Sequence, residues 1–527
     1  MFTNFVKLLY SNLVMKKLKF WILLSLALHI LAAAFNVGYQ YYDEYFQTIE
    51  FASAKIGLTP FSELPWEYPA QIRSWFLPSI IYLLVKISHG LGVTTAKYQM
   101  FVIQFFFSLL GWAASLVFYQ TLLKQKDTIK QTIENSIWKW FCLFWFLPYF
   151  HVRTSGENVG TSLWLLGFSL FIQEGSIGLT FLSGLLLGLS FLTRFQMGVM
   201  IAGLFAWRLF VGVKNSADKG VTDTVTRTNR KGRRGQTYST LIAAGLGLLA
   251  AYGLGMCLDY WGYGVWTHSA WNYFKINLLE HRANDFGTSP WWEYFSLLWD
   301  QVPLGLGLYF PVLFALGWLY NPLSPLTWIG IPFSLIHCGI AHKELRFVYP
   351  LVPFLPVYLS EFLTLHPQII RGVKLFFQKL LNFFSTLIRR YWILGCCLLL
   401  PTAVFRAERN PFIWYGYIST HYPQSLSLVG WSIDPFRDVF PVYFYRPRYY
   451  KFHKIETSEA LQTWIEEKDT YVFRPDTQIP LPYQDLLSKC QLVYQVFPEY
   501  FKKLNINHWL DRAANWGLYF CPKSQRK

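Results

Sequence analysis

Apolar stretches recur along most of this chain, with short polar stretches between them. Runs of about 17 to 25 predominantly apolar residues are long enough to cross a bilayer as helices. The pattern predicts about eleven transmembrane helices, near residues 20–38, 98–123, 137–150, 158–173, 177–193, 196–213, 239–258, 302–320, 324–341, 346–363 and 391–405. We therefore expect an all-α polytopic membrane protein.

The segment 75–91, "WFLPSIIYLLVKISHGL", decides the predicted topology because it is short and contains Lys86 and His89. Basic residues favour the cytoplasmic ends of membrane helices. If the segment lies along the membrane surface, all the basic clusters fall on the cytoplasmic side. These clusters are at the N-terminus and at 124–130, 214–234 and 371–390. This choice predicts a cytoplasmic N-terminus and an extracytoplasmic tail.

The part of the chain after the last predicted span, which we call the tail, differs in composition from the preceding residues. We expect residues 1–405 to form a transmembrane catalytic domain and residues 406–527 a small soluble extracytoplasmic domain. Cys490 and Cys521 lie in this tail and would be able to pair in an oxidising compartment, although the sequence leaves that pairing open. Near the other end, the apolar positions after Asp43 and Glu44 predict amphipathic helices lying on the membrane surface.

Composition supports the membrane assignment. The 527 residues are 53% hydrophobic and only 15% charged, whereas soluble domains carry about 25% charged residues. The net charge of +17 is explained by cytoplasmic loop anchors, so nucleic acid is not an expected partner. The glycines of "AAGLGLLAAYGLG" (243–255) lie inside a span, where they predict close helix packing and not a phosphate-binding loop.

The predicted topology places most of the unusual polar groups on the outer face. Ionisable residues at membrane depth are costly and usually mark a functional site. Asp43 and Glu44 fit either a general base at the mouth of a membrane cavity or an acidic first helical turn. Adjacent carboxylates point in different directions, so at most one would face the reacting atom.

The other candidate site residues also have ordinary structural explanations. The side chains of Glu67, Arg73, Arg153, Glu157 and Trp291 would bind substrate, or would belong to tight turns and an interfacial belt. Arg194 would bind phosphate or reach toward the headgroups. "HKELRF" concentrates His342, Lys343 and Arg346 on the outer face, where an anionic ligand would explain them. The His and Cys spacing matches no standard metal site, so we expect no metal.

Several of these motifs together resemble glycosyltransferase family 22. The motifs are "DEYFQTIEFA", "WEY" with "RSW", "RT" followed by a glutamate, "GTSPWWEYF" and "HKELRFVYPLVPF", in order from about residue 40 to residue 356. The family contains the lipid-phosphate-mannose-dependent mannosyltransferases of GPI-anchor and N-glycan assembly, and the resemblance is to the GPI mannosyltransferase III type. It implies a GT-C fold with its site on the lumenal or periplasmic face.

The resemblance also implies roles for named residues. Asp43 would be the catalytic base with Glu44 beside it, and His342, Lys343 and Arg346 would bind the donor phosphate. The donor would be polyprenyl- or dolichyl-phosphate-mannose and the acceptor a lipid-linked glycan, with no separate cofactor. A single carboxylate base opposite the leaving group predicts inversion at the anomeric carbon.

Two further features bear on the compartment and on the rival function. Tyr41 and Tyr42 stand where the GPI enzymes usually carry His-Pro, and the chain has no N-x-Ser/Thr sequon. Both favour a bacterial plasma membrane over the endoplasmic reticulum membrane. The alternative function is a transporter or flippase of polyprenyl-linked sugars, for which we would expect internal repeats and mid-membrane binding residues.

Overall fold

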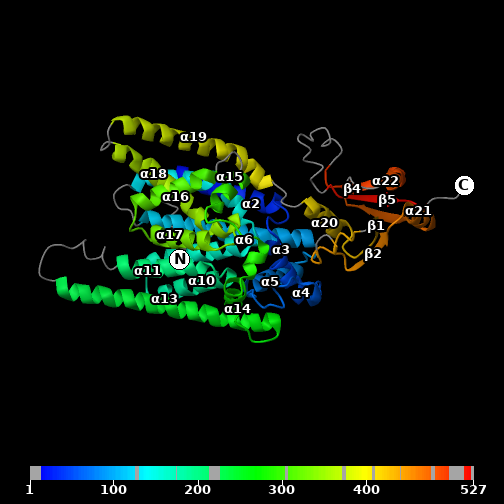
Figure 1. Cartoon of the computed structure of the whole chain (residues 1–527), viewed down its shortest axis with the longest axis horizontal. Coiled ribbons are helices and arrows are strands. Elements are labelled where there is room, and N and C mark those ends of the chain that lie inside the picture. The colour runs from blue at the N-terminus through cyan, green and yellow to red at the C-terminus, as the bar shows by residue number, and fades with distance from the viewer. Residues whose placement is uncertain are drawn as a thin grey trace. The chain divides into compact units, whose positions relative to one another are not determined.

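The computed structural model describes residues 14–124, 130–173, 175–212, 226–302, 307–370, 375–405, 410–431, 433–438, 441–475, 481–497 and 515–523. Parts of all four predicted cytoplasmic clusters, residues 1–13, 125–129, 214–225 and 371–374, lie outside this description. The chain forms two compact units (Figure 1). The first contains Met1–Ala33, Trp66–Leu77 and Phe105–Phe405, and the second contains Ala34–Pro65, Pro78–Gln104 and Arg406–Lys527. The second unit thus includes two early segments that the sequence assigned to the domain 1–405.

The first unit is built from helices. They are α2 (Val14–Phe35), α7 (Lys130–Leu143), α8 (Phe146–His151), α9 (Gly156–Ile172), α10 (Ile177–Thr193), α11 (Met197–Trp207), α13 (Thr226–Tyr263), α14 (Ser269–Phe274), α15 (Glu293–Gln301), α16 (Tyr309–Tyr320), α17 (Pro325–Gly339), α18 (Leu355–Ile370) and α19 (Leu375–Phe405). Two further helices, α5 (Phe76–Gly90) and α6 (Ala96–Lys124), contribute residues to both units. Each predicted span overlaps a helix, although 346–363 begins as the 3₁₀ helix Leu345–Phe354.

Helix length and apolarity identify only some of these helices as spans by themselves. Across the described ranges, Ala96–Lys124 and Gly235–Tyr263 are each long and apolar enough to cross a membrane, and five further apolar helices are 10–17 residues long. The count of eleven spans therefore stays a prediction. Helix α5, at 15 residues, is about 22 Å long at 1.5 Å per residue, which is shorter than the hydrocarbon core.

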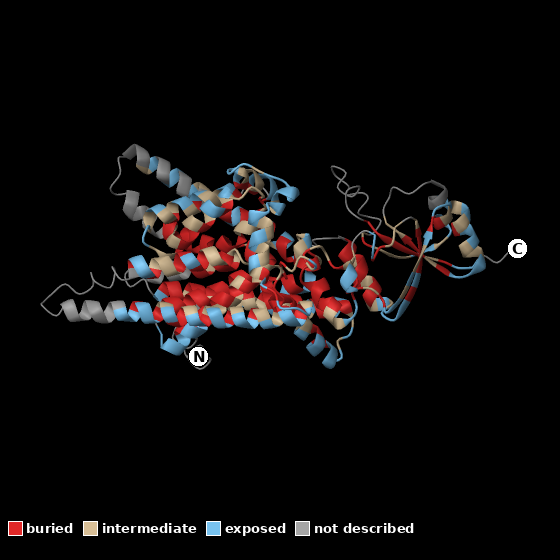
Figure 2. Ribbon diagram, turned by 60° about the horizontal axis from the view of Figure 1, so that its bottom comes forward, coloured by how far each residue is buried: buried red, intermediate tan, exposed pale blue. Residues whose placement is uncertain are grey.

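Small residues set the packing of α9, α10 and α13. The backbones approach so closely that a Cβ atom on Gly247 would lie 2.1 Å from the carbonyl oxygen of Phe181. The Ser190 hydroxyl donates to the carbonyl oxygen of Gly160 at 2.6 Å. Figure 2 shows buried residues between the helices and exposed ones on their outer faces. The close packing predicted for glycines of 243–255 is confirmed at Gly247.

The second unit combines α3 (Tyr42–Phe46), α4 (Ile49–Ile56) and α20 (Asn410–His421) with an α/β tail. The tail has strands β1 (Ser425–Trp431), β2 (Tyr449–Ile455), β3 (Thr470–Arg474), β4 (Gln491–Gln495) and β5 (Gly517–Cys521) and helices α21 (Ser458–Glu467) and α22 (Leu481–Ser488). The sheet order is β2-β1-β3-β5-β4, with β1 parallel to β2 and β3, and β5 antiparallel to β3 and β4. The all-α prediction is therefore wrong for the tail.

The core of the tail contains Val429, Leu461, Val472 and Cys521, all fully or almost fully buried. Cys521 is bonded to Cys490, with their Cα atoms 4.5 Å apart. This disulfide ties the turn after α22 to the inner strand β5. The pairing that the sequence left open is present in the structure.

Candidate active site

A buried ion-pair cluster lies in the first unit where the ends of α9 and α10 meet. A Cβ atom on Gly156 would lie 2.5 Å from the carbonyl oxygen of Thr193, so only glycine permits this approach. The Ser155 side chain caps α9 by accepting from the N–H of Asn158 at 3.2 Å. The same turn places Glu157 Oε1 3.0 Å from Arg194 Nη2, at the end of α10. Glu157 is 1% exposed and Arg194 is 7% exposed.

Arg346 joins this cluster from the 3₁₀ helix that follows "HKEL". Its Nε atom lies 2.6 Å from Glu344 Oε2 and 3.9 Å from Glu157 Oε1. The guanidinium groups of Arg194 and Arg346 lie 5.3 Å and 5.4 Å from the centre of the Phe347 ring. Three sequence motifs, around residues 157, 194 and 346, therefore meet at one place.

His342 and Lys343 connect the cluster to the aromatic loop after Phe286. His342 Nε2 lies 3.1 Å from Glu344 Oε1, and its Nδ1 lies 3.1 Å from the carbonyl oxygen of Gly287. Hydrogen bonding to Glu344 raises the pKa of His342 above its usual value. The Lys343 ammonium group donates to the carbonyl oxygens of Ser289 and Ile340 at 3.0 Å and 2.6 Å.

The charges of this cluster do not cancel. Arg194, Lys343 and Arg346 carry three positive charges, and Glu157 and Glu344 carry two negative ones. The net charge of these five groups is +1, and it becomes +2 when His342 is protonated. Guanidinium groups bind phosphate well, so the cationic side chains of this cluster suit an anion.

The segment 66–77 is fixed by a carboxylate that the sequence analysis missed. Asp259, near the end of α13, accepts from the N–H of Trp75 at 2.7 Å and from the Ser269 hydroxyl at 2.5 Å. The Tyr263 hydroxyl donates to the carbonyl oxygen of Arg73 at 2.7 Å. The sequence feature that could have identified Asp259 is its position, because it is a carboxylate directly after the end of a predicted span.

Two predicted site residues, Glu67 and Arg73, lie in the same segment. Glu67 is 7% exposed, and the Arg73 guanidinium lies 5.5 Å from the centre of the Tyr273 ring. The ring of Trp66 lies 6.2 Å from that of Phe286, which lies 6.0 Å from that of His342. This row of rings links "WEY" to "HKELRF".

Arg153 is buried beside the cluster's first helix, at 1% exposed. Its Nε atom donates to the carbonyl oxygen of Tyr149 at 3.3 Å, and the guanidinium lies 4.7 Å from the centre of the Tyr149 ring. Asn158 Nδ2 donates to the carbonyl oxygen of Arg153 at 2.7 Å. These contacts hold the turn between α8 and α9.

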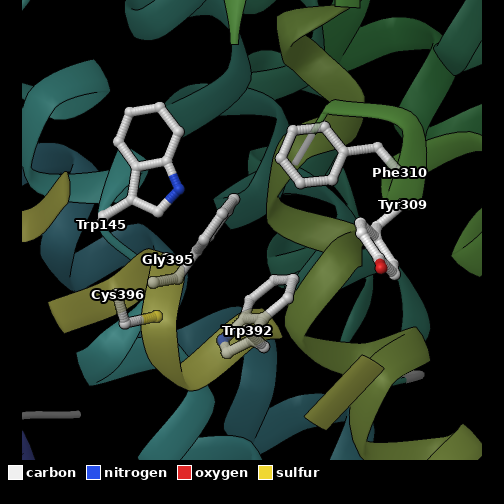
Figure 3. A pocket seen from close by; sticks show the side chains of 7 residues that line it. Trp145, Tyr309, Phe310, Trp392, Gly395 and Cys396 are labelled. Atoms are coloured by element: carbon white, nitrogen blue, oxygen red, sulfur yellow. The ribbon is translucent and has the colours of Figure 1, made fainter. Parts of the chain in front are cut away.

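An apolar cavity of about 400 Å³ opens beside Leu345, the residue before Arg346. Its lining includes Trp145, Phe314, Cys338 and Tyr349, and also Trp291, which is 66% exposed. A smaller pocket of about 20 Å³ shares Trp145 and Phe310 with it (Figure 3). Tyr309, Trp392 and Cys396 also line this smaller pocket. Cavities with apolar walls suit hydrocarbon chains.

The acid pair belongs to the second unit. Glu44 is 4% exposed, and its Oε2 atom accepts from the N–H of Gln40 at 3.0 Å. Asp43, at the start of α3, is half-buried. The prediction of an amphipathic helix on the membrane surface is wrong at α4, because all residues from Ile49 to Ala54 are buried within the protein.

Among the described residues, no group of three or more His, Cys, Asp and Glu side chains is arranged to hold a metal ion. The structure brings together Glu157, Arg194, His342, Lys343 and Arg346 in one cluster. Glu67, Arg73 and Arg153 lie in the same unit, and Trp291 lines its cavity.

Comparison with known proteins assigns the family. The model of the Alg9-like mannosyltransferase family matches residues 20–415. The chain belongs to the Alg9-like mannosyltransferase family. The family predicted from the motifs is thereby confirmed, and a membrane-embedded protein is expected of this family.

Individual relatives agree with the predicted group. The chain is 26% identical to GPI alpha-1,2-mannosyltransferase 3 of Homo sapiens over 354 residues, which cover 66% of this chain and 57% of the relative. It is 25% identical to GPI mannosyltransferase 3 of Gibberella zeae, covering 62% and 57%. The chain thus spans a little over half the length of these relatives. The resemblance to the GPI mannosyltransferase III type is confirmed.

A solved structure is also similar. The crystal structure of ArnT from Cupriavidus metallidurans in the apo state has a TM-score of 0.46 and 9% sequence identity, covering 96% of this chain and 98% of that chain.

Proposed function

We propose that this protein transfers a mannosyl residue from a polyprenyl- or dolichyl-phosphate-linked donor to a lipid-linked glycan. The reaction takes place on the lumenal or periplasmic face, within a GT-C fold. Membership of the mannosyltransferase family supports the reaction class. The observation that carries the donor assignment is the buried, positively charged cluster of Arg194, Arg346 and Lys343 beside an apolar cavity.

The donor has two parts, and each fits a feature of the first unit. The phosphate carries negative charge, and the cluster offers guanidinium and ammonium groups with a net positive charge. The lipid chain is hydrocarbon, and the 400 Å³ cavity at Leu345 is lined by aromatic and aliphatic side chains. The start of the 3₁₀ helix at Leu345 and Arg346 would lie at the junction of phosphate and chain.

The reaction is a displacement at the anomeric carbon. The acceptor hydroxyl oxygen forms a bond to C1, and the bond from C1 to the phosphate oxygen breaks, with its electron pair remaining on the phosphate. Asp43 takes the hydroxyl proton as general base, and Glu44 lies beside it. Arg194, Lys343, Arg346 and protonated His342 stabilise the charge that develops on the departing phosphate.

This chemistry needs no metal or organic cofactor, since the cationic side chains supply the charge that a metal would otherwise supply. Attack opposite the leaving phosphate inverts the configuration at C1. Glu157 holds Arg194 in place, and Glu67, Arg73, Arg153 and Trp291 contact the substrates or support the loops that do.

The experiment is a transfer assay with purified protein in detergent, polyprenyl-phosphate-mannose and a panel of lipid-linked glycans. Arg346→Gln should raise the donor KM by about 10- to 100-fold, since a hydrogen bond to a charged group contributes about 1.5–3 kcal/mol. Lys275→Gln, at an exposed ion pair 3.5 Å long, is the matched control and should leave KM unchanged.

Two results would contradict the proposal. The first is absence of transfer from any polyprenyl-linked sugar by wild-type protein. The second is movement of intact lipid-linked sugar across vesicle membranes without transfer, which would favour the flippase alternative.

A further inference from the structure

The tail beyond residue 405 packs directly against the helices that carry the acid pair. The ring of Phe412, on α20, lies 4.9 Å from the ring of Tyr45 and 5.1 Å from that of Tyr39. The ring of Tyr445, also in the tail, stacks on that of Tyr45 at 6.4 Å and lies 5.6 Å from that of Phe412. Tyr45 follows Glu44 on α3, so aromatic packing with the tail reaches the acid pair's own helix.

The same helix α20 is anchored in the tail's sheet. The ring of Trp414 lies 5.1 Å from that of Phe473 on β3 and 5.7 Å from that of Trp516. Trp414 is fully buried. The chain of contacts therefore runs from the sheet through α20 to α3.

A second connection is polar and passes through Glu50, which is 1% exposed on α4. Its Oε1 atom accepts from the N–H of Phe444 in the tail at 3.2 Å. Its Oε2 atom lies 2.5 Å from the Thr59 hydroxyl oxygen, which lies 2.7 Å from the Ser53 hydroxyl oxygen. A buried carboxyl group thus bridges segments almost 400 residues apart in the sequence.

We infer that Glu50 is a positioning residue for the acid pair: by binding the backbone of Phe444, it fastens the tail segment 441–446 to α4 and so fixes α3 with Asp43 and Glu44. The inference rests on the proposed function for the role of Asp43. It also assigns a role to the tail, as the support of the helices that hold the base.

The surroundings of Glu50 favour the neutral carboxyl group. Burial raises its pKa to about 7. Within the described part of the chain, the titratable groups that face it are the tyrosines Tyr45, Tyr415 and Tyr445, and none of these is cationic. A protonated Glu50 can donate to the Thr59 hydroxyl, which then donates its own hydrogen bond to the Ser53 hydroxyl, while Oε1 still accepts from the N–H of Phe444. Glutamine can reproduce this pattern, because its amide donates and its carbonyl accepts.

The test compares Glu50→Ala, Glu50→Gln and Glu63→Gln with wild type in full-length protein at pH 6.5. The last variant is a matched control, since Glu63 makes an exposed 3.5 Å ion pair with Arg437 in the same unit. Hydrogen exchange of the α3 and α4 backbone amides is measured together with kcat and KM for transfer. Hydrogen exchange can be measured whether or not the protein transfers mannose. Failure of the proposed function can therefore be distinguished from failure of this inference.

Glu50→Ala should speed exchange at least tenfold at the amides of Glu44, in α3, and of Gln47, which caps the end of α3. It should also lower kcat by about 10- to 100-fold with KM within twofold, because a misplaced catalytic group costs rate more than binding. Glu50→Gln should restore both, and Glu63→Gln should change neither. Two results would overturn the inference, whatever the transfer activity of the variant. The first is that the α3 amides of Glu50→Ala exchange as slowly as those of the wild-type protein. The second is that exchange becomes faster only in residues 441–446.

Discussion

The Nη2 atom of Arg194 lies 3.0 Å from Oε1 of Glu157, and both side chains are almost fully buried. The pair joins the first turn of α9 to the end of α10. It also orders a guanidinium group that we propose to bind the donor phosphate. Removing one member of a buried ion pair leaves the other charge buried without compensation. This destabilises the folded protein more than replacing both members does.

Glu157→Ala should therefore destabilise the protein by about 3–5 kcal/mol. Thermal or denaturant unfolding in detergent measures this loss. Glu280→Ala serves as control, because the Lys275–Glu280 pair is about half exposed and 3.5 Å long, and such a pair contributes no more than about 1 kcal/mol. Equal effects of the two substitutions would show that the Arg194–Glu157 pair does not act as a buried pair.

Stability of the second unit should depend on pH through Glu50. Burial raises the pKa of this carboxyl group from 4.5 to about 7, so folding favours the protonated form. The stability due to neutral Glu50 is fully present below pH 4.5 and is lost as the pH rises through about 7. A shift of this size corresponds to about 3 kcal/mol.

Glu50→Gln, which cannot ionise, should remove that part of the pH dependence. The variant should be more stable than wild type at pH 8 and similar to it at pH 5. Exchange of α4 amides as a function of pH measures the difference. The same slope in both proteins would mean that Glu50 is not the titrating group.

The disulfide between Cys490 and Cys521 should stabilise the tail. The cysteines are 31 residues apart in sequence, and closing a loop of this length contributes about 3–4 kcal/mol by the chain-entropy estimate. Replacing both by serine should lower the tail's stability by that amount, whereas Cys397→Ser, at an exposed free cysteine, should not. Rapid maleimide labelling of Cys490 and Cys521 in unreduced protein would contradict the pairing.

The helices could be predicted from hydropathy and the residues of the basic cluster from the motifs, because both depend on local sequence patterns. Each predicted span overlaps a helix, and "HKELRF", Glu157 and Arg194 meet although only their shared outer face was predicted. The mixed sheet of the tail was missed because its strands are only five to seven residues long, too short for a clear alternating pattern. Whether Cys490 and Cys521 pair also depends on tertiary structure.

Glu50 shows a different limit of sequence reasoning. The residues after Asp43 have an amphipathic pattern, which predicted a helix at the membrane surface. The structure instead buries α4 within the second unit, where the partner of Glu50 is the backbone of Phe444. A backbone N–H far along the chain leaves no signal in the sequence. Asp259 could have been noticed beside the end of a predicted span, but its partner, the N–H of Trp75, could not have been predicted.

The central claim is that Asp43 is the base of a lipid-phosphate-dependent mannosyl transfer. Its most direct test is the initial rate of transfer from polyprenyl-phosphate-mannose by Asp43→Asn, Glu44→Gln and wild type, with donor binding and unfolding checked for each. We expect Asp43→Asn to lower kcat by about 10²- to 10⁴-fold, as loss of a general base does, with donor binding unchanged. Glu44→Gln should retain more activity, because Glu44 is buried and accepts from the N–H of Gln40. Full activity of Asp43→Asn in folded protein would contradict the assignment of the base.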